Sequence, residues 1–144
     1  MPPLVDEHAI TITAGTGTVW RALGEALDRT FSPMAVYTRL IGCTDRTASG
    51  PRPPVEGSTF PGFRVTSAVP GTELVLQGRH RFSTYALTFR LDQLGPGRSR
   101  LRAESRAAFP GPLGRCYRFL VIGTGGHVLA VRRLLSRVAA RAER

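Results

Sequence analysis

The strongest constraint on the fold of this chain is an alternation of apolar and polar residues between Phe63 and Phe109. Alternation with a period of two is the pattern of a β-strand with one buried face. Turn residues rich in Gly and Pro separate the alternating runs at 69–72 and at 95–97. Short connections of this kind join neighbouring antiparallel strands. The segment therefore predicts several antiparallel strands that share one apolar face.

Each predicted strand contributes one row of residues to that face. The rows are Phe63, Val65, Ser67 and Val69; Leu74, Leu76, Gly78, His80 and Phe82; Tyr85, Leu87, Phe89 and Leu91; and Leu101, Ala103, Ser105, Ala107 and Phe109. Arginines alternate with the last row and mark the solvent face. A weaker row, made of Ala35, Tyr37, Arg39 and Ile41 or of their opposite neighbours, predicts a further strand at 35–41.

A long helix is predicted after the strands, beginning near Leu113. Its apolar stripe recurs at steps of three and four residues and should pack on the sheet: Tyr117, Val121, Thr124, Val128, Val131, Leu135 and Val138. Three glycines, at 123, 125 and 126, interrupt the stripe and should together cost about 2 to 3 kcal/mol relative to alanine. We expect the helix to break there, the alternative being an unbroken helix whose backbone closely approaches the sheet or a ligand.

The N-terminal half predicts a first strand at 8–13 and then a helix whose apolar face carries Val19, Trp20, Leu23 and Leu27. Trp20 is expected to be a core anchor. A Gly/Pro-rich loop is predicted at about 43–62. We expect it to form a flap over a pocket mouth, the alternative being simple disorder. Residues 55–59 could pair as a short edge strand.

Length and composition narrow the function classes. The 144 residues fit one domain, and the start carries neither a signal-peptide pattern nor a membrane-spanning run, so we expect a cytoplasmic protein. All basic residues are arginine, which suits a high-GC bacterial genome and explains much of the net charge of +10 without a functional cause. The arginine rows lack interleaved aromatic residues, which makes nucleic-acid binding an unfavourable interpretation. Cys43 and Cys116 stand alone and predict buried or half-buried free thiols rather than a metal or redox site.

Several inner-face positions are small, where a packed core would more often place a large aliphatic residue. Either the C-terminal helix packs closely there or a ligand cavity is present, and the pattern leaves both open. The predicted pocket residues are Tyr37, Phe63, Val65, Ser67, Leu76, Gly78, His80, Tyr85, Leu87, Phe89, Ala103, Ser105, Ala107, Val121, Thr124 and Val128.

His80 is the best candidate for chemistry, with Tyr85 second, because both should face the cavity and an imidazole can exchange protons near neutral pH. The competing interpretation is a buried, hydrogen-bonded histidine, or one that a β-bulge turns to solvent. Among the histidines, only His80 and His127 are expected to meet inside the fold. No third ligand has zinc-site spacing, so we expect neither a metal nor a cofactor.

The order of elements resembles the helix-grip fold of the START-like (SRPBCC) superfamily, which includes polyketide cyclases and Bet v 1 type proteins. The segments 61–65, 73–76, 78–89 and 120–127 are similar to its uncharacterised bacterial branch. The resemblance implies an α+β fold in which a curved, seven-stranded antiparallel sheet wraps around a long C-terminal helix, with a largely apolar cavity between them. It does not imply a reaction.

Three functional hypotheses follow. The first is binding of a small hydrophobic or amphipathic ligand, lipid-like or polyketide-like, by a monomer or homodimer, and the sequence favours it over an enzyme. The second is a polyketide cyclase or dehydratase that uses His80 and Tyr85. The third is an interaction protein that docks weakly on an anionic partner or membrane surface through Arg133, Arg137 and Arg141.

Overall fold

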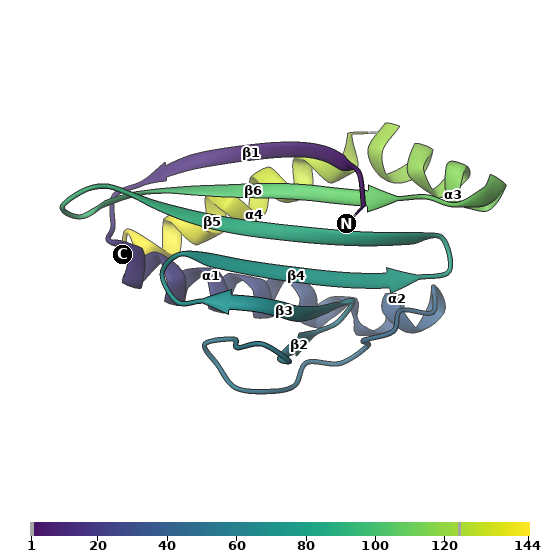
Figure 1. Ribbon diagram of the computed structural model, residues 1–144, viewed down its shortest axis with the longest axis horizontal. Helices are drawn as coiled ribbons and strands as arrows, with labels where there is room; N and C mark the ends of the chain where they lie inside the picture. The colour runs from purple at the N-terminus through teal and green to yellow at the C-terminus, as the bar shows by residue number, and fades with distance from the viewer. Residues whose placement is uncertain (1, 124) are drawn as a thin grey trace.

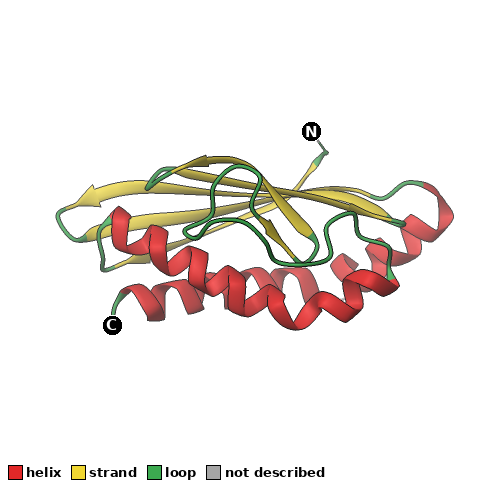
Figure 2. Ribbon diagram, turned by 90° about the horizontal axis from the view of Figure 1, so that it is seen from below, coloured by secondary structure: helices red, strands yellow, loops and turns green. Residues whose placement is uncertain are grey.

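The computed structural model describes residues 2–123 and 125–144, and in it six antiparallel strands form one sheet with helices on one of its faces (Figures 1 and 2). The strands are β1 Leu4–Ile12, β2 Thr59–Phe60, β3 Phe63–Val69, β4 Glu73–His80, β5 Ser83–Gly95 and β6 Arg98–Ala108. Their order across the sheet is β1-β6-β5-β4-β3-β2. The predicted α+β, helix-grip class is confirmed, although the described residues form six strands where the resemblance implied seven.

The helices lie against the inner face of the sheet, where the alternating rows place their apolar side chains. They are α1 Thr16–Phe31, the short 3₁₀ turn η1 Ser32–Met34, α2 Ala35–Leu40, α3 Gly111–Arg118, the π-helical turn η2 Phe119–Gly123 and α4 Gly126–Ala142. Helices α1 and α4 contact each other as well as the sheet. Trp20 is a buried core residue, as predicted, and it packs in one cluster with Leu23 and Leu27 of α1 and Val131 and Val138 of α4.

The strand predicted at 35–41 is wrong, because these residues form helix α2. Pro33 lies in the first turn of η1, where its fixed backbone angle favours a helical start. The hydroxyl of Thr38 donates to the carbonyl of Ala35 at 2.7 Å, a helical spacing of three residues. Thr38 is the buried residue of α2, whereas Tyr37 and Arg39 are exposed. Over six residues, an apparent alternation does not separate a strand from a short helix.

The first strand begins at Leu4, four residues before the predicted start, and pairs with β6 along its length. Asp6 lies opposite Ser105 and His8 opposite Ala103, so both polar side chains lie on the inner face of the sheet. Polar residues on the buried face interrupt the apolar alternation by which a strand is recognised. The sequence pattern therefore showed only the second half of β1.

The C-terminal helix is broken at the glycines, as expected. Gly125 has a φ of 78°, a left-handed conformation that glycine adopts readily and that cannot continue a right-handed helix. One segment, α3 with η2, precedes this residue and α4 follows it. The C-terminal helical region therefore consists of two parts that place different side chains over the sheet.

The middle of the segment between α2 and β2, where a flap was expected, packs on the rest of the fold. Arg52 donates to Asp28 of α1 at 2.8 Å and to the carbonyl of Thr59 at 2.9 Å, and Pro54 is buried against Gly24. An isolated bridge joins Ser49 to Thr59. These contacts hold the middle of the loop on α1 and the sheet edge. The predicted edge strand does form, but as β2 at 59–60.

Ion pairs cover the outer face of the sheet. Arg90 pairs with Glu73 and Glu104 across neighbouring strands, and Arg102 pairs with Asp92 at 2.9 Å. Arg106 also pairs with Glu104. The arginine row of β6 is therefore a partly neutralised solvent face, which explains its alternation without a nucleic-acid partner.

Two further sequence expectations concern the surface. Cys43 is buried, but Cys116 is exposed on α3, so the predicted burial of Cys116 is wrong. The buried position of α3 is Gly114. Within the described part of the chain, no helix has both the length and the apolar character needed to cross a membrane.

Gly78 is an inner-face position at which close packing leaves no space for a side chain. A Cβ atom at this position would collide with the carbonyl oxygen of Gly62 and with the ring of Tyr85, its cross-strand partner. The aromatic ring therefore occupies the space that a side chain at 78 would need. This position is filled by protein and contributes no room for a ligand.

We predict that Gly78→Ala lowers the free energy of unfolding by about 1 to 3 kcal/mol, because the added methyl group overpacks this contact. Gly95→Ala is the matched control: Gly95 also lies in a strand, and its Cβ would meet nothing within 4 Å. Urea unfolding of both variants measures the difference. Equal stability of the two variants would contradict the packing argument.

Candidate functional site

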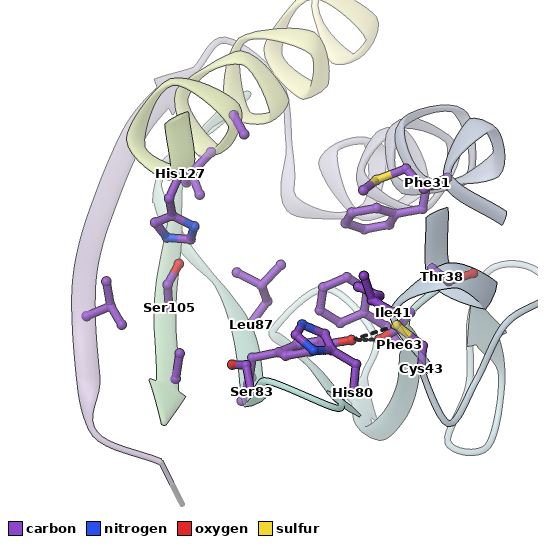
Figure 3. Close-up of a pocket in the computed structure, with 18 of the residues that line it drawn as sticks. Phe31, Thr38, Ile41, Cys43, Phe63, His80, Ser83, Leu87, Ser105 and His127 are labelled. Carbon is purple, nitrogen blue, oxygen red and sulfur yellow. Dashed lines mark hydrogen bonds between the residues drawn. The ribbon is translucent and has the colours of Figure 1, made fainter. Parts of the chain in front are cut away.

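A cavity of about 260 Å³ lies between the sheet and the helices, where β4 ends and β5 begins (Figure 3). The sheet side is formed by residues of β1 and of β3 to β6, and the helix side by the end of α1, by α2, by α3 and η2, and by the first half of α4. The other half of the inner face is packed solid by Leu23, Leu27, Leu135 and Val138. The cavity therefore occupies one end of the sheet.

Seven of the predicted pocket residues line this cavity: Tyr37, Phe63, His80, Tyr85, Leu87, Ser105 and Ala107. Tyr37 reaches it from helix α2 rather than from a strand. Their function in ligand binding stays a prediction.

Seven other predicted residues do not line it: Val65, Ser67, Leu76, Gly78, Phe89, Ala103 and Val128. Val65, Leu76, Phe89 and Ala103 belong to the packed core, because α1 and α4 cover their part of the sheet. A register shift between Val65 and Ser67 places Ser67 opposite Val75, on the other face of the sheet. Val128 lies on α4 outside the cavity wall. The predictions for the side chains of Val121 and Thr124 lie outside the described residues.

A continuous series of aromatic rings forms one wall of the cavity. The ring of Phe31 lies 4.8 Å from that of Phe63, which contacts Tyr85 at 5.1 Å between ring centroids. His80 follows at 5.5 Å from Tyr85 and 4.8 Å from Tyr117. Edge-to-face and tilted pairs of this kind are favourable beyond their buried area. The wall offers the π faces and edges that a flat ring would contact.

Tyr85 is held inside the fold by its own hydroxyl group. The hydroxyl donates to the carbonyl of Gly62 at 2.6 Å and lies 3.7 Å from the sulfur of Cys43. Burial raises the pKa of the Tyr85 phenol far above its ordinary value of 10.0. Burial also raises the pKa of the Cys43 thiol. Tyr85 is therefore a neutral group whose proton already has a protein acceptor.

One ring nitrogen of His80 is also occupied by a hydrogen bond within the protein. The backbone N–H of Phe82 donates to His80 Nδ1 at 3.1 Å, so Nδ1 carries no proton and the neutral ring holds its proton on Nε2. Burial lowers the pKa of the imidazole below its ordinary value of 6.5. At neutral pH His80 is thus a hydrogen-bond donor through Nε2, and its basic nitrogen is already in use. This arrangement suits positioning a ligand better than accepting a proton from one.

The opposite wall carries a polar cluster that the sequence did not predict. Asp6 of β1 accepts a contact from His127 Nε2 at 3.3 Å through one oxygen and from His8 Nε2 at 3.3 Å through the other. His127 lines the cavity. The sequence predicted that His127 meets His80. In the structure His127 pairs with Asp6 instead, and Asp6 also pairs with His8. The sequence signal was present in the alternation of Asp6 and His8, which continues into Ile10 and Ile12.

Ser105 lies on the same side of the cavity as His127 in Figure 3. Its side chain is 3% exposed, and its hydroxyl oxygen has no hydrogen-bond partner among the described residues. A buried hydroxyl without a partner costs about 1 to 3 kcal/mol. Ser105 is therefore a polar group that a bound molecule or a water molecule could satisfy.

The helix side of the cavity was largely missed by the sequence analysis. Tyr117 is the clearest example: its hydroxyl lies 2.8 Å from that of Tyr37, and this hydrogen bond joins α3 to α2 at the rim of the cavity. Phe31, Ile41 and Ile122 also line the cavity. Phe31, Tyr117 and Ile122 appear in the sequence as ordinary apolar positions, and Ile41 as part of the strand predicted at 35–41. Only the placement of α2 and the helix break show that they face open space.

Within residues 2–123 and 125–144, no group of three or more His, Cys, Asp and Glu side chains is arranged to hold a metal ion. The contacts of Asp6 are two separate pairs with histidines.

The fold is shared with solved structures of low sequence identity. The aromatase/cyclase Zhui from Streptomyces sp. R1128 aligns with a TM-score of 0.63 at 14% identity, over 96% of this chain and 93% of its own. The Rhizobium loti protein Mll3558 aligns with a TM-score of 0.59 at 19% identity, over 94% of each chain. Norcoclaurine synthase from Thalictrum flavum, in complex with dopamine and hydroxybenzaldehyde, aligns with a TM-score of 0.55 at 11% identity, over 96% and 86%.

No family model and no curated protein sequence matches the chain. The structural likenesses establish the helix-grip fold. At these identities the likeness does not extend to a reaction.

We predict that His80 titrates with a midpoint below 6.5, because burial favours its neutral form in the folded state. The unfolded chain then binds a proton at a higher pH than the folded chain. Stability is therefore fullest above about pH 6.5 and decreases as the pH falls from there through the folded-state pKa. NMR titration of the His80 ring proton, assigned with His80→Gln, measures the midpoint. A midpoint at or above 6.5 would contradict the predicted effect of burial.

Proposed function

We propose that this chain, which has the helix-grip fold of SRPBCC proteins, binds a small amphipathic molecule that combines an aromatic or apolar body with one hydrogen-bonding group. The observation that carries the proposal is the composition of the cavity. One wall of the cavity is aromatic and runs from Phe31 to Tyr117. The opposite wall carries the Ser105 hydroxyl, which has no partner among the described residues, and the His127 imidazole, which is hydrogen-bonded to the Asp6 carboxylate. Ligand sites are mostly apolar with a few polar groups that fix orientation.

The size of the cavity narrows the ligand class. At about 260 Å³ it is slightly below the range of roughly 300 to 1,000 Å³ that is common for ligand pockets. A one-ring or two-ring molecule or a single short acyl chain fits this space, whereas a two-chain lipid does not. Of the lipid-like and polyketide-like ligands expected from the sequence, the proposal therefore retains the small and compact ones.

The polar wall would fix the orientation of the ligand in the cavity. A polar atom of the ligand near Ser105 would satisfy a hydroxyl that otherwise stays buried without a partner. Asp6 accepts from Nε2 of His127, so Nδ1 is the ring nitrogen that remains for a ligand. A hydroxyl group is the ligand group that serves both residues, since it both donates and accepts. We therefore infer a phenol-like or alcohol-like ligand.

The geometry supports binding more than the cyclase or dehydratase alternative. That alternative needs His80 as a proton-transfer group and Tyr85 as its companion. The hydroxyl of Tyr85 donates to Gly62, and Nδ1 of His80 accepts from Phe82. Both groups therefore stabilise the cavity wall, and only Nε2–H of His80 is available to a ligand as a donor.

We predict that filling the cavity abolishes binding. Ala107→Phe places a ring among the lining residues, and it should weaken binding of the probe 2-naphthol by at least about tenfold, equivalent to 1.4 kcal/mol. Ala108→Phe is the matched control, because Ala108 is the next and last residue of β6 and pairs with Thr84 on the outer face. Isothermal titration calorimetry measures both affinities. Unchanged binding by Ala107→Phe, in a folded variant, would remove the cavity as the binding site.

We also predict opposite effects of Ser105→Ala on stability and on binding. Removing an unpartnered buried hydroxyl should leave the free energy of unfolding unchanged or higher. The same change should weaken binding of 2-naphthol while leaving binding of naphthalene, which lacks the hydroxyl, almost unaffected. Fluorescence titration of both probes against both proteins gives the comparison. Equal losses for the two probes would mean that Ser105 acts only by packing.

A further inference from the structure

We propose that the end of the molecule formed by α2, α3 with η2, and the β4–β5 turn is a docking surface for an anionic lipid bilayer. These elements lie together at one end of the sheet, opposite the β5–β6 turn (Figure 1). The proposal rests on exposed apolar side chains, on the charge around them, and on the cavity rim between them. It concerns a surface and does not depend on which molecule the cavity binds.

Large apolar side chains are strongly exposed at this end. Val36 and Leu40 of α2 are 68% and 71% exposed, and Leu113 and Phe119 of the α3–η2 segment are 69% and 68% exposed. Leu120 is also 65% exposed. On the α3–η2 segment the buried residue is Gly114, packed against Phe109, so the apolar side chains project from the opposite side. Clustered exposed apolar residues of this size mark an interaction surface.

The charge around these residues is of one sign. Arg39 of α2, Arg81 of the β4–β5 turn, and Arg115 and Arg118 of α3 are all exposed. None of the ion pairs found among residues 2–123 and 125–144 involves them. The sequence contains no Asp or Glu at 29–44 or at 105–142, the segments that supply α2, α3 and η2. This end of the molecule is therefore apolar and cationic without an internal counter-charge.

This combination fits an anionic bilayer better than a second copy of the chain. Two copies that met through this surface would bring two sets of unpaired arginines together, which repel each other. In a bilayer, leucine and phenylalanine side chains enter the acyl boundary while arginines contact anionic headgroups through their long stems. The sequence predicted an anionic contact through other arginines, on α4. Two of these are less suited to contact a bilayer, because Arg141 pairs with Glu25 and Arg137 donates to Thr30, both on α1.

The cavity rim lies within the same surface. The hydrogen bond between Tyr37 and Tyr117 joins the two helices that carry the exposed apolar residues, and both tyrosines line the cavity. A bilayer that contacts α2 and α3 would therefore face the rim. An apolar molecule could then pass between the acyl region and the cavity without crossing bulk water.

The test is co-sedimentation of the full chain with vesicles of phosphatidylcholine alone and with vesicles of equal parts phosphatidylcholine and phosphatidylglycerol. We expect binding to the mixed vesicles that weakens as salt rises. Arg115→Ala with Arg118→Ala should weaken it by roughly thirtyfold, from about 1 kcal/mol for each arginine at an anionic surface. Phe119→Asp should also reduce it by at least about tenfold.

Matched controls lie at the other end of the sheet. Arg98→Ala with Arg100→Ala removes the same charge from exposed positions, and Leu94→Asp makes the same kind of change at a residue that is 41% exposed. These variants should bind the mixed vesicles like the parent chain. No binding to the mixed vesicles, or equal losses in the control variants, would overturn the proposal.

Two further readouts separate the alternatives. Light scattering without vesicles that shows a dimer disrupted by Phe119→Asp would assign the surface to a second copy and overturn the bilayer proposal. Binding of 2-naphthol should be unchanged in Phe119→Asp, and vesicle binding should be unchanged in Ala107→Phe. Failure of the cavity proposal and failure of the docking proposal are therefore distinguishable.

Discussion

The break at Gly125 is the feature on which the arrangement of the cavity depends. Its left-handed backbone ends one helical segment and begins α4. After the break, α4 packs Val131, Leu135 and Val138 into the core with α1. Before it, α3 and η2 are free to approach α2, where Tyr117 meets Tyr37 at 2.8 Å. One glycine thus separates the part of the helical region that fills the core from the part that borders the cavity.

Small residues on the inner face have different physical causes, although they look alike in the sequence. Gly78 is small because the ring of Tyr85 and the carbonyl of Gly62 occupy its side-chain space. Ala103 lies in the packed core. Ser105 and Ala107 border the cavity. Close packing and an open cavity therefore occur together at different positions along one sheet.

The sequence predicted strands β3 to β6 well because each buries one face, and burial of one face imposes a period of two. It predicted α2 as a strand, since six residues carry too little periodicity. It placed Leu76 and Phe89 in the pocket because alternation identifies the inner face but does not show how far helices cover it. The polar pair of Asp6 and His127 joins residues that are 121 positions apart, and no local pattern connects them.

The distribution of carboxylates explains why a chain with a net charge of +10 is cationic in some places and not in others. Glu73, Asp92 and Glu104 face the outer side of the sheet and neutralise its arginines. Glu25 and Asp28 do the same for Arg141 and Arg52 beside α1. A high-GC genome can account for many arginines, but it does not explain why acidic residues are absent from both segments that form the cavity rim. The uncompensated charge and the exposed apolar side chains coincide at the end of the molecule where the cavity rim lies, which a compositional bias alone would not produce.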